Sequence, residues 1–80
     1  MLTRYIQAAM RHASFRWLAE DQVWFGEIPE LSGVWATAET EEGCRAELQD
    51  VLEEWIALGI RLGHSIPRLD NVEVVVEAVG

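Results

Sequence analysis

The sequence predicts an α+β domain in which a long helix packs on a small, antiparallel-rich sheet. Two segments repeat apolar residues every three or four positions, which is typical of amphipathic helices. Other segments alternate apolar and polar residues and are separated by turn-forming residues, which is typical of strands. The expected order is helix, three-strand meander, long helix and strand. With 80 residues, the chain is expected to form one domain over 1–80.

The first expected helix covers residues 1–13, and a three-strand meander follows over residues 14–38. A polar turn at 20–22 joins two segments rich in aromatic residues, which predicts a hairpin. Pro29 must end regular pairing because proline has no N–H to donate. The segment from Pro29 to Gly33 turns the chain into a third strand at 34–38.

The longest element is a helix expected over residues 40–62, with Thr40 as its N-cap. Glu41 and Glu42 place negative charge at the positive end of the helix dipole, and Gly63 and Pro67 mark its end. Valines then alternate with acidic residues, which predicts a final strand over residues 71–79.

Large aromatic residues are expected on both faces of this sheet. Trp24 and Phe25 are adjacent in one strand, so their side chains point to opposite faces. One long helix covers only one face. Either the first helix or another subunit must therefore cover the second face.

The charge excludes several partner classes. Fourteen acidic residues against six arginines and no lysine give a net charge of −8. Such a chain is a poor ligand for a phosphate backbone or an anionic membrane. We therefore expect no direct nucleic-acid binding and no membrane binding. No secretory leader or transmembrane run is recognised, so a cytoplasmic protein is expected.

The small size predicts a partner chain, because a domain of this length buries too little surface to be strongly stable alone. Cys44 is the single cysteine, so no internal disulfide can form, and it lies on the apolar stripe of the long helix. His12 and His64 flank helix ends, far from each other in the sequence, and no metal-ligand spacing is present. We therefore expect a homo-oligomer, a dimer or higher, with no metal or cofactor.

The stretch W-F-G-E-I-P-E-L-S-G-V-W-A at 24–36, followed by Thr40 and Glu42 opening a long amphipathic helix, resembles the HicB-like antitoxin family. The resemblance covers about residues 14–67. It implies a partly degraded ribonuclease-H-like fold with a β-β-β-α-β core, to which residues 1–13 add a helix. It also implies a protein that neutralises a HicA-type toxin, a small basic RNase that cleaves mRNA, by occluding it.

This sequence departs from the family pattern in several places. Ser32 stands where many members have a second proline, Ala38 replaces a common glycine, and Gly43 replaces a helix-favouring alanine. No sequence follows residue 80, where many such antitoxins carry a DNA-binding domain. The chain is therefore expected to be a stand-alone member, and operator binding is not implied for it.

The acidic residues do not form a pattern typical of a metal-dependent nuclease. That chemistry needs an acid inside a central strand with other acids converging on it. Glu27 is the one acid inside an expected meander strand, and the helix acids fall mainly on an exposed face. We therefore expect no enzymatic activity and name no catalytic, cofactor-binding or metal-binding residue.

The candidate partner-binding residues are Trp24, Glu27, Glu30 and Trp35. We expect at least one of the two tryptophans to contact another chain. The leading hypothesis is an antitoxin-type binding module whose acidic surface attracts a basic RNase. The alternatives are a solitary homo-oligomeric relative without a toxin and a remnant metal-dependent nuclease. A small basic gene beside this one would favour the antitoxin.

Overall fold

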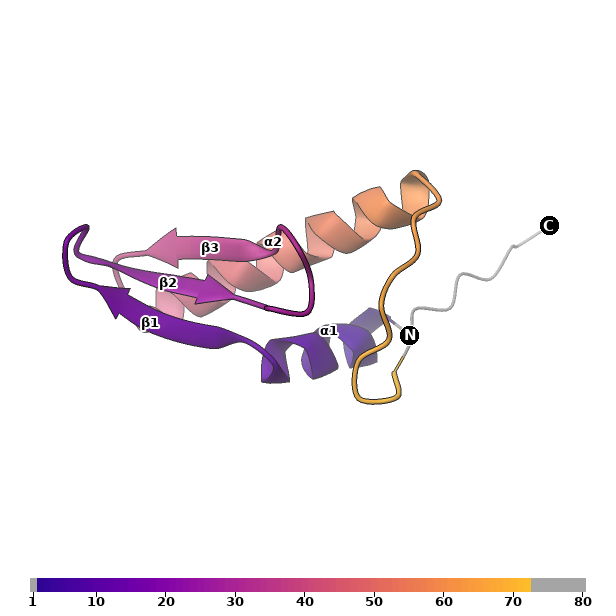
Figure 1. The fold of residues 1–80 in the computed structure, drawn as a ribbon, viewed down its shortest axis with the longest axis horizontal. Coiled ribbons are helices and arrows are strands. Elements are labelled where there is room, and N and C mark those ends of the chain that lie inside the picture. The colour runs from indigo at the N-terminus through magenta and orange to yellow at the C-terminus, as the bar shows by residue number, and fades with distance from the viewer. Residues whose placement is uncertain (1, 73–80) are drawn as a thin grey trace.

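The computed structural model describes residues 2–72, and residue 1 and residues 73–80 lie outside the description. The elements are α1 (Leu2–Arg11), β1 (Ser14–Leu18), β2 (Val23–Glu27), β3 (Trp35–Ala38) and α2 (Glu41–Arg61). The predicted α+β class, with a helix packed on an antiparallel sheet, is confirmed (Figure 1). The final strand expected over 71–79 lies outside the described residues except for its first two positions.

The three strands form an antiparallel sheet in the order β1-β2-β3. Phe15 pairs with Gly26 and Gly26 with Ala36, while Arg16 pairs with Phe25 and Phe25 with Thr37. Paired residues share a face and successive residues alternate between faces. This register therefore fixes which side chains look toward α2 and which look away from it.

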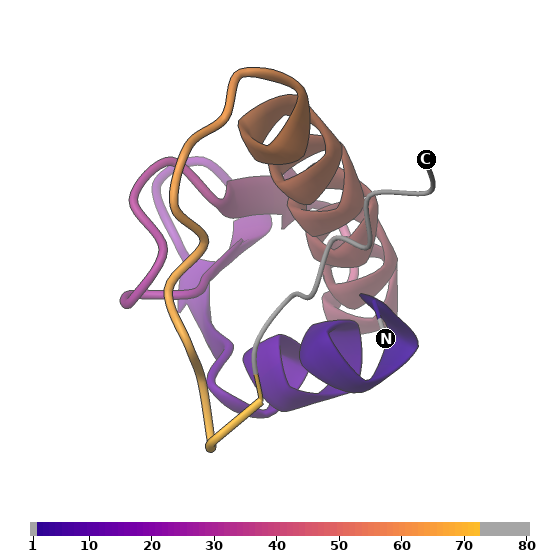
Figure 2. The ribbon, with the colours of Figure 1, turned by 90° about the vertical axis from the view of Figure 1, so that its right-hand side faces the viewer.

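Both helices lie on the same side of the sheet. In Figure 1 the sheet lies in front of α2, and in Figure 2 α1 and α2 lie together on one side, with the sheet on the other. α2 packs on β2 and β3, and α1 packs against α2. The N-terminal helix does not cover the second face of the sheet, which removes one of the two arrangements expected from the sequence.

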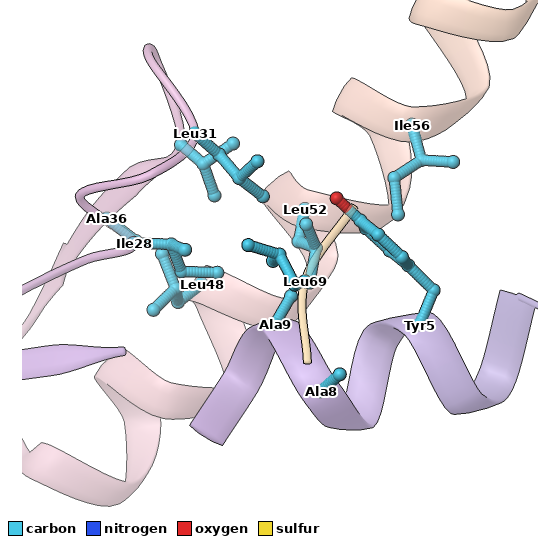
Figure 3. Packing of buried hydrophobic residues seen from close by; sticks show 11 residues of the cluster. Tyr5, Ala8, Ala9, Ile28, Leu31, Ala36, Leu48, Leu52, Ile56 and Leu69 are labelled. Atoms are coloured by element: carbon cyan, nitrogen blue, oxygen red, sulfur yellow. The ribbon is translucent and has the colours of Figure 1, made fainter. Parts of the chain in front are cut away.

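The hydrophobic core forms where α1, α2, the turn after β2 and the chain after α2 meet (Figure 3). α2 contributes Leu48, Leu52 and Ile56, spaced four residues apart on one stripe and each at most 1% exposed. Tyr5 from α1 reaches the same cluster and is fully buried. The other members of the cluster are Ala8, Ala9, Ile28, Leu31, Val34, Ala36 and Leu69.

The proline-containing turn between β2 and β3 is a structural anchor. Ile28, Leu31 and Val34 are each at most 2% exposed. Backbone bonds run from Ile28 N–H to the Val34 carbonyl at 3.1 Å and from Leu31 N–H to the Ile28 carbonyl at 2.9 Å. Gly33 closes the turn at φ 92°, a conformation that glycine adopts without strain. Core packing and backbone geometry therefore explain most of the residue types between Ile28 and Val34.

Thr40 caps α2 as predicted. Its backbone is extended, and its hydroxyl oxygen accepts a hydrogen bond from the Gly43 N–H at 2.9 Å. Leu62 ends the helix, and Gly63 follows at φ 72°. The capped helix begins directly after β3, so the chain reverses onto the sheet within a few residues.

The chain after α2, residues 63–72, runs back to α1 and is called the strap here. The Tyr5 hydroxyl donates a hydrogen bond to the Pro67 carbonyl, and burial raises the pKa of Tyr5. Leu69 is 5% exposed, lies in the core, and forms a short bridge with Val72. The strap thereby covers the end of the core that the sheet does not reach (Figure 2).

Gly26 gives a test of the contact between sheet and helix. A Cβ atom there would lie 2.7 Å from the Phe15 ring and 3.1 Å from the Cys44 sulfur. We expect Gly26→Ala to lower the free energy of unfolding by about 1–3 kcal/mol through overpacking, measured by urea denaturation. Phe15→Leu replaces the obstructing ring with a smaller side chain, so the double variant should recover part of the lost stability. Unchanged stability in the single variant would contradict this packing.

Candidate protein-binding surfaces

The sheet face turned away from α2 is called the open sheet face. Its strand residues follow from the register and are Ser14, Arg16, Leu18, Val23, Phe25, Glu27, Trp35 and Thr37. Neither helix covers this face, and Trp35 is 55% exposed. A half-exposed tryptophan beside other apolar side chains is typical of a contact surface.

An aromatic pair on the open sheet face joins the central strand β2 to the edge strand β3. The rings of Phe25 and Trp35 stack with centroids 6.1 Å apart and an interplanar angle of 22°. The Arg16 guanidinium lies 4.8 Å from the centroid of Phe25 and forms an ion pair with Glu27 at 3.7 Å. The two charged strand residues of this face therefore neutralise each other.

A second surface, called the hairpin hollow, lies at the end of the β1–β2 hairpin. It is a shallow depression of about 510 Å³ lined by Trp17, Asp21, Gln22, Val23 and Glu39. Trp17 is 47% exposed and meets Trp24 edge to face at 5.9 Å. Two carboxylates beside an exposed indole suit a cationic side chain, because both the charge and the aromatic face attract cations.

The four candidate residues from the sequence fall in three places. Trp35 and Glu27 pair across strands on the open sheet face. Trp24 lies on the opposite face, where it supports Trp17 in the hairpin hollow. Glu30 lies in the turn after β2 and contacts His12. One flat contact cannot include both tryptophans.

His12 joins three parts of the chain through its imidazole ring. Nδ1 lies 2.9 Å from Glu30 Oε2, and Nε2 lies 2.9 Å from Asp70 Oδ1. Ionised carboxylates only accept hydrogen bonds, so both ring nitrogens must donate and the ring is an imidazolium. Arg11 adds an ion pair to Asp70 at 3.5 Å. This cluster links the end of α1 to the turn and to the strap.

The pKa values respond to these contacts. Hydrogen bonds to Asp70 and Glu30 raise the pKa of His12. The His12 hydrogen bond lowers the pKa of Glu30 and of Asp70. Sequence reasoning placed His12 at a helix end but did not find its partners, because they lie 18 and 58 positions away.

Cys44 is fully buried under the sheet, as its place on the apolar stripe predicted. Its thiol points to the carbonyls of Ala36 and Trp24 at 3.5 and 3.6 Å. Burial, followed by the charge of Glu41, raises the pKa of the thiol. A raised pKa lowers the thiolate fraction, so this cysteine suits packing and not nucleophilic attack.

Within residues 2–72, no three His, Cys, Asp or Glu side chains are placed to hold a metal ion. None of the helices in the same range is both long and apolar enough to cross a bilayer.

An open groove of about 670 Å³ between α1 and α2 has a mixed lining that includes Ile6, Met10, Arg11 and Arg45.

Comparison with known proteins identifies the family. The model of the UPF0150-like family matches residues 4–67, from α1 to the strap. The chain belongs to the UPF0150-like family. The matched range contains the hairpin, the buried turn and the whole of α2.

A solved structure extends this relation over almost the whole chain. The crystal structure of TTHA0281 from Thermus thermophilus is 38% identical in sequence and superposes with a TM-score of 0.88. The alignment covers 96% of this chain and 95% of that one. No curated protein matches the chain. The UPF0150-like assignment therefore establishes family and fold, and the activity has to be argued from the surfaces.

The His12 cluster predicts a specific pH dependence for this UPF0150-like protein. The pKa of His12 is raised in the folded state, so protonated His12 stabilises the fold. This stabilisation is complete below the ordinary pKa of 6.5 and is lost as the pH rises through the folded-state pKa. The lowered carboxyl pKa values of Glu30 and Asp70 contribute above their ordinary values of 4.5 and 3.8, and are lost as the pH falls through the lowered values. The cluster therefore stabilises the fold most between about pH 5 and about pH 6.5.

We expect His12→Gln to reduce the loss of stability between about pH 6 and about pH 8.5, because the variant has no imidazolium to deprotonate. The urea midpoint at each pH measures this loss. His64→Gln is the matched control, since His64 lies in the exposed part of the strap, and it should keep the wild-type difference. An equal pH dependence in His12→Gln and the wild type would refute the role given to the cluster.

Proposed function

We propose that the protein is a HicB-like, antitoxin-type binding module that neutralises a small basic RNase of the HicA type by occlusion. The observation that carries the proposal is the hairpin hollow, where the exposed Trp17 lines one depression together with the acidic Asp21 and Glu39. Membership of the UPF0150-like family supports it, as does the resemblance of residues 14–67 to HicB-like antitoxins.

Charge makes a basic partner the natural one. The chain carries a net charge of −8, and the acids around the hollow add to those in the first turn of α2, Glu41 and Glu42. A field of one sign accelerates the encounter with a partner of opposite charge. An arginine or lysine of that partner can then pair with the carboxylates and lie against the Trp17 indole.

Occlusion needs no catalytic residue on this side of the complex. A surface that holds the cationic side chains with which an RNase contacts RNA denies those side chains to the phosphate backbone. The protein is proposed to act in this stoichiometric way and not as an enzyme.

Binding to a purified HicA-type RNase tests the proposal. We expect Trp17→Ala to weaken the complex by about tenfold or more, as for an aromatic hot spot. Asp21→Asn and Glu39→Gln should each weaken it a few-fold, by about 0.2–1 kcal/mol, as partly exposed charge pairs do. Glu54→Gln, on the exposed side of α2, removes the same charge outside the hollow and is the matched control.

The outcomes are distinct. If Glu54→Gln weakens binding as much as Asp21→Asn, only the overall charge matters and the hollow is not the site. If the wild-type chain neither binds such an RNase nor reduces its cleavage of RNA, the antitoxin assignment fails. Association should also slow as salt rises from about 50 mM to about 300 mM, because salt screens the attraction.

A nuclease assay tests the proposed absence of enzymatic activity. We expect no cleavage of RNA by the isolated chain with magnesium or manganese added. Cleavage that Glu27→Gln abolishes would instead identify a metal-dependent nuclease, since Glu27 is the acid inside β2.

A further inference from the structure

The open sheet face requires an occupant that the described chain does not supply. Both helices lie on the other side of the sheet, and within residues 2–72 Trp35 remains 55% exposed. The stacked Phe25 and Trp35 rings form an apolar patch on this face. A three-stranded sheet with one aromatic face in water is a poor arrangement for so small a domain.

The charges on the two sides of the protein differ, and this difference selects the occupant. The strand residues of the open sheet face include one arginine and one glutamate, and these are paired with each other at 3.7 Å. The face is therefore locally neutral on a chain whose net charge is −8. A strongly basic partner has little to gain from a neutral face. A second copy of the chain would be repelled by an acidic face. It can pack against the open sheet face because this face is neutral.

We propose that two copies of the chain form a two-fold symmetric dimer by packing their open sheet faces against each other. In a two-fold interface each face meets itself, so a neutral face avoids like-charge repulsion. The Phe25 and Trp35 rings form the centre of the contact, and the Arg16–Glu27 pairs lie around it. The dimer is a four-layer sandwich of helix, sheet, sheet and helix.

This arrangement also separates the acidic surfaces of the two copies. The exposed acids of α2 lie behind each sheet, and the two sheets pack about 10 Å apart. The helices lie farther apart than the sheets and face the solvent, where ions screen charges separated by more than the Debye length of about 8 Å at physiological salt. The hairpin hollows lie at the ends of the sheets, apart from the aromatic centre. Apart from Val23, which lies at the border of both surfaces, dimerisation and the proposed partner binding therefore use different residues.

Sedimentation of the full chain tests the dimer. We expect the 9.1 kDa monomer to be replaced by a species of twice that mass as the protein concentration rises from about 1 µM to about 500 µM, a range suited to a small interface. Trp35→Ser should weaken the dimer at least about tenfold. Trp17→Ser is the matched control, a similarly exposed tryptophan on the other face, and should leave the dimer unchanged.

Thr37→Glu is a second probe that leaves the aromatic pair in place. Thr37 is exposed at the edge of the face, and in the dimer the substitution would place a new carboxylate from each copy in the apolar contact, where burying a charge is costly. It should therefore also shift the protein to monomer, with an unchanged far-UV circular dichroism spectrum. Raising the salt should maintain or strengthen the dimer, because it screens the repulsion between two chains of charge −8.

Several results would overturn the proposal. These are a monomer over the whole concentration range, a dimer unaffected by both Trp35→Ser and Thr37→Glu, and a dimer weakened as much by Trp17→Ser as by Trp35→Ser. A basic RNase that loses binding in Trp35→Ser while the dimer persists would assign the face to that partner instead. Salt is expected to weaken the proposed toxin complex but not the dimer, so the two proposals can fail independently.

Discussion

The burial of one stripe of α2 is the constraint on which the rest of the structure depends. Leu48, Leu52 and Ile56 repeat every fourth residue and are almost completely buried. The sheet, the turn after β2, α1 and the strap all pack on this stripe. Truncating a buried leucine in such a position costs about 2–5 kcal/mol, a large part of the stability of so small a domain.

Within the described residues, using one helix face for all packing leaves the opposite side of the sheet uncovered. α1 could have closed that side, but its buried residues Tyr5, Ala8 and Ala9 direct it to the α2 stripe. The strap holds it there through the Tyr5–Pro67 bond and the His12–Asp70 contact. The core is thereby completed at one end of the molecule, and within residues 2–72 the aromatic sheet face is left uncovered.

The two surfaces divide the chemistry of the protein between them. The hairpin hollow combines acids with the Trp17 indole, whereas the open sheet face combines aromatic rings with an internally neutral ion pair. A cationic ligand is attracted to the first surface and a second copy of the chain is tolerated by the second. Negative charge thus favours a cationic ligand at the hairpin hollow. At the open sheet face, the neutral ion pair is what tolerates a second copy of the acidic chain.

Local patterns in the sequence determined the element types, the Thr40 cap, the buried Cys44 and the opposite directions of Trp24 and Phe25, because all of these depend on neighbouring residues. The sequence also named Trp24, Glu27, Glu30 and Trp35 as one candidate set. Only the tertiary structure decided that they occupy three places and that Glu30 is held by His12. Contacts between residues 18 and 58 positions apart depend on how α1 and the strap pack on α2, and no local periodicity encodes that packing.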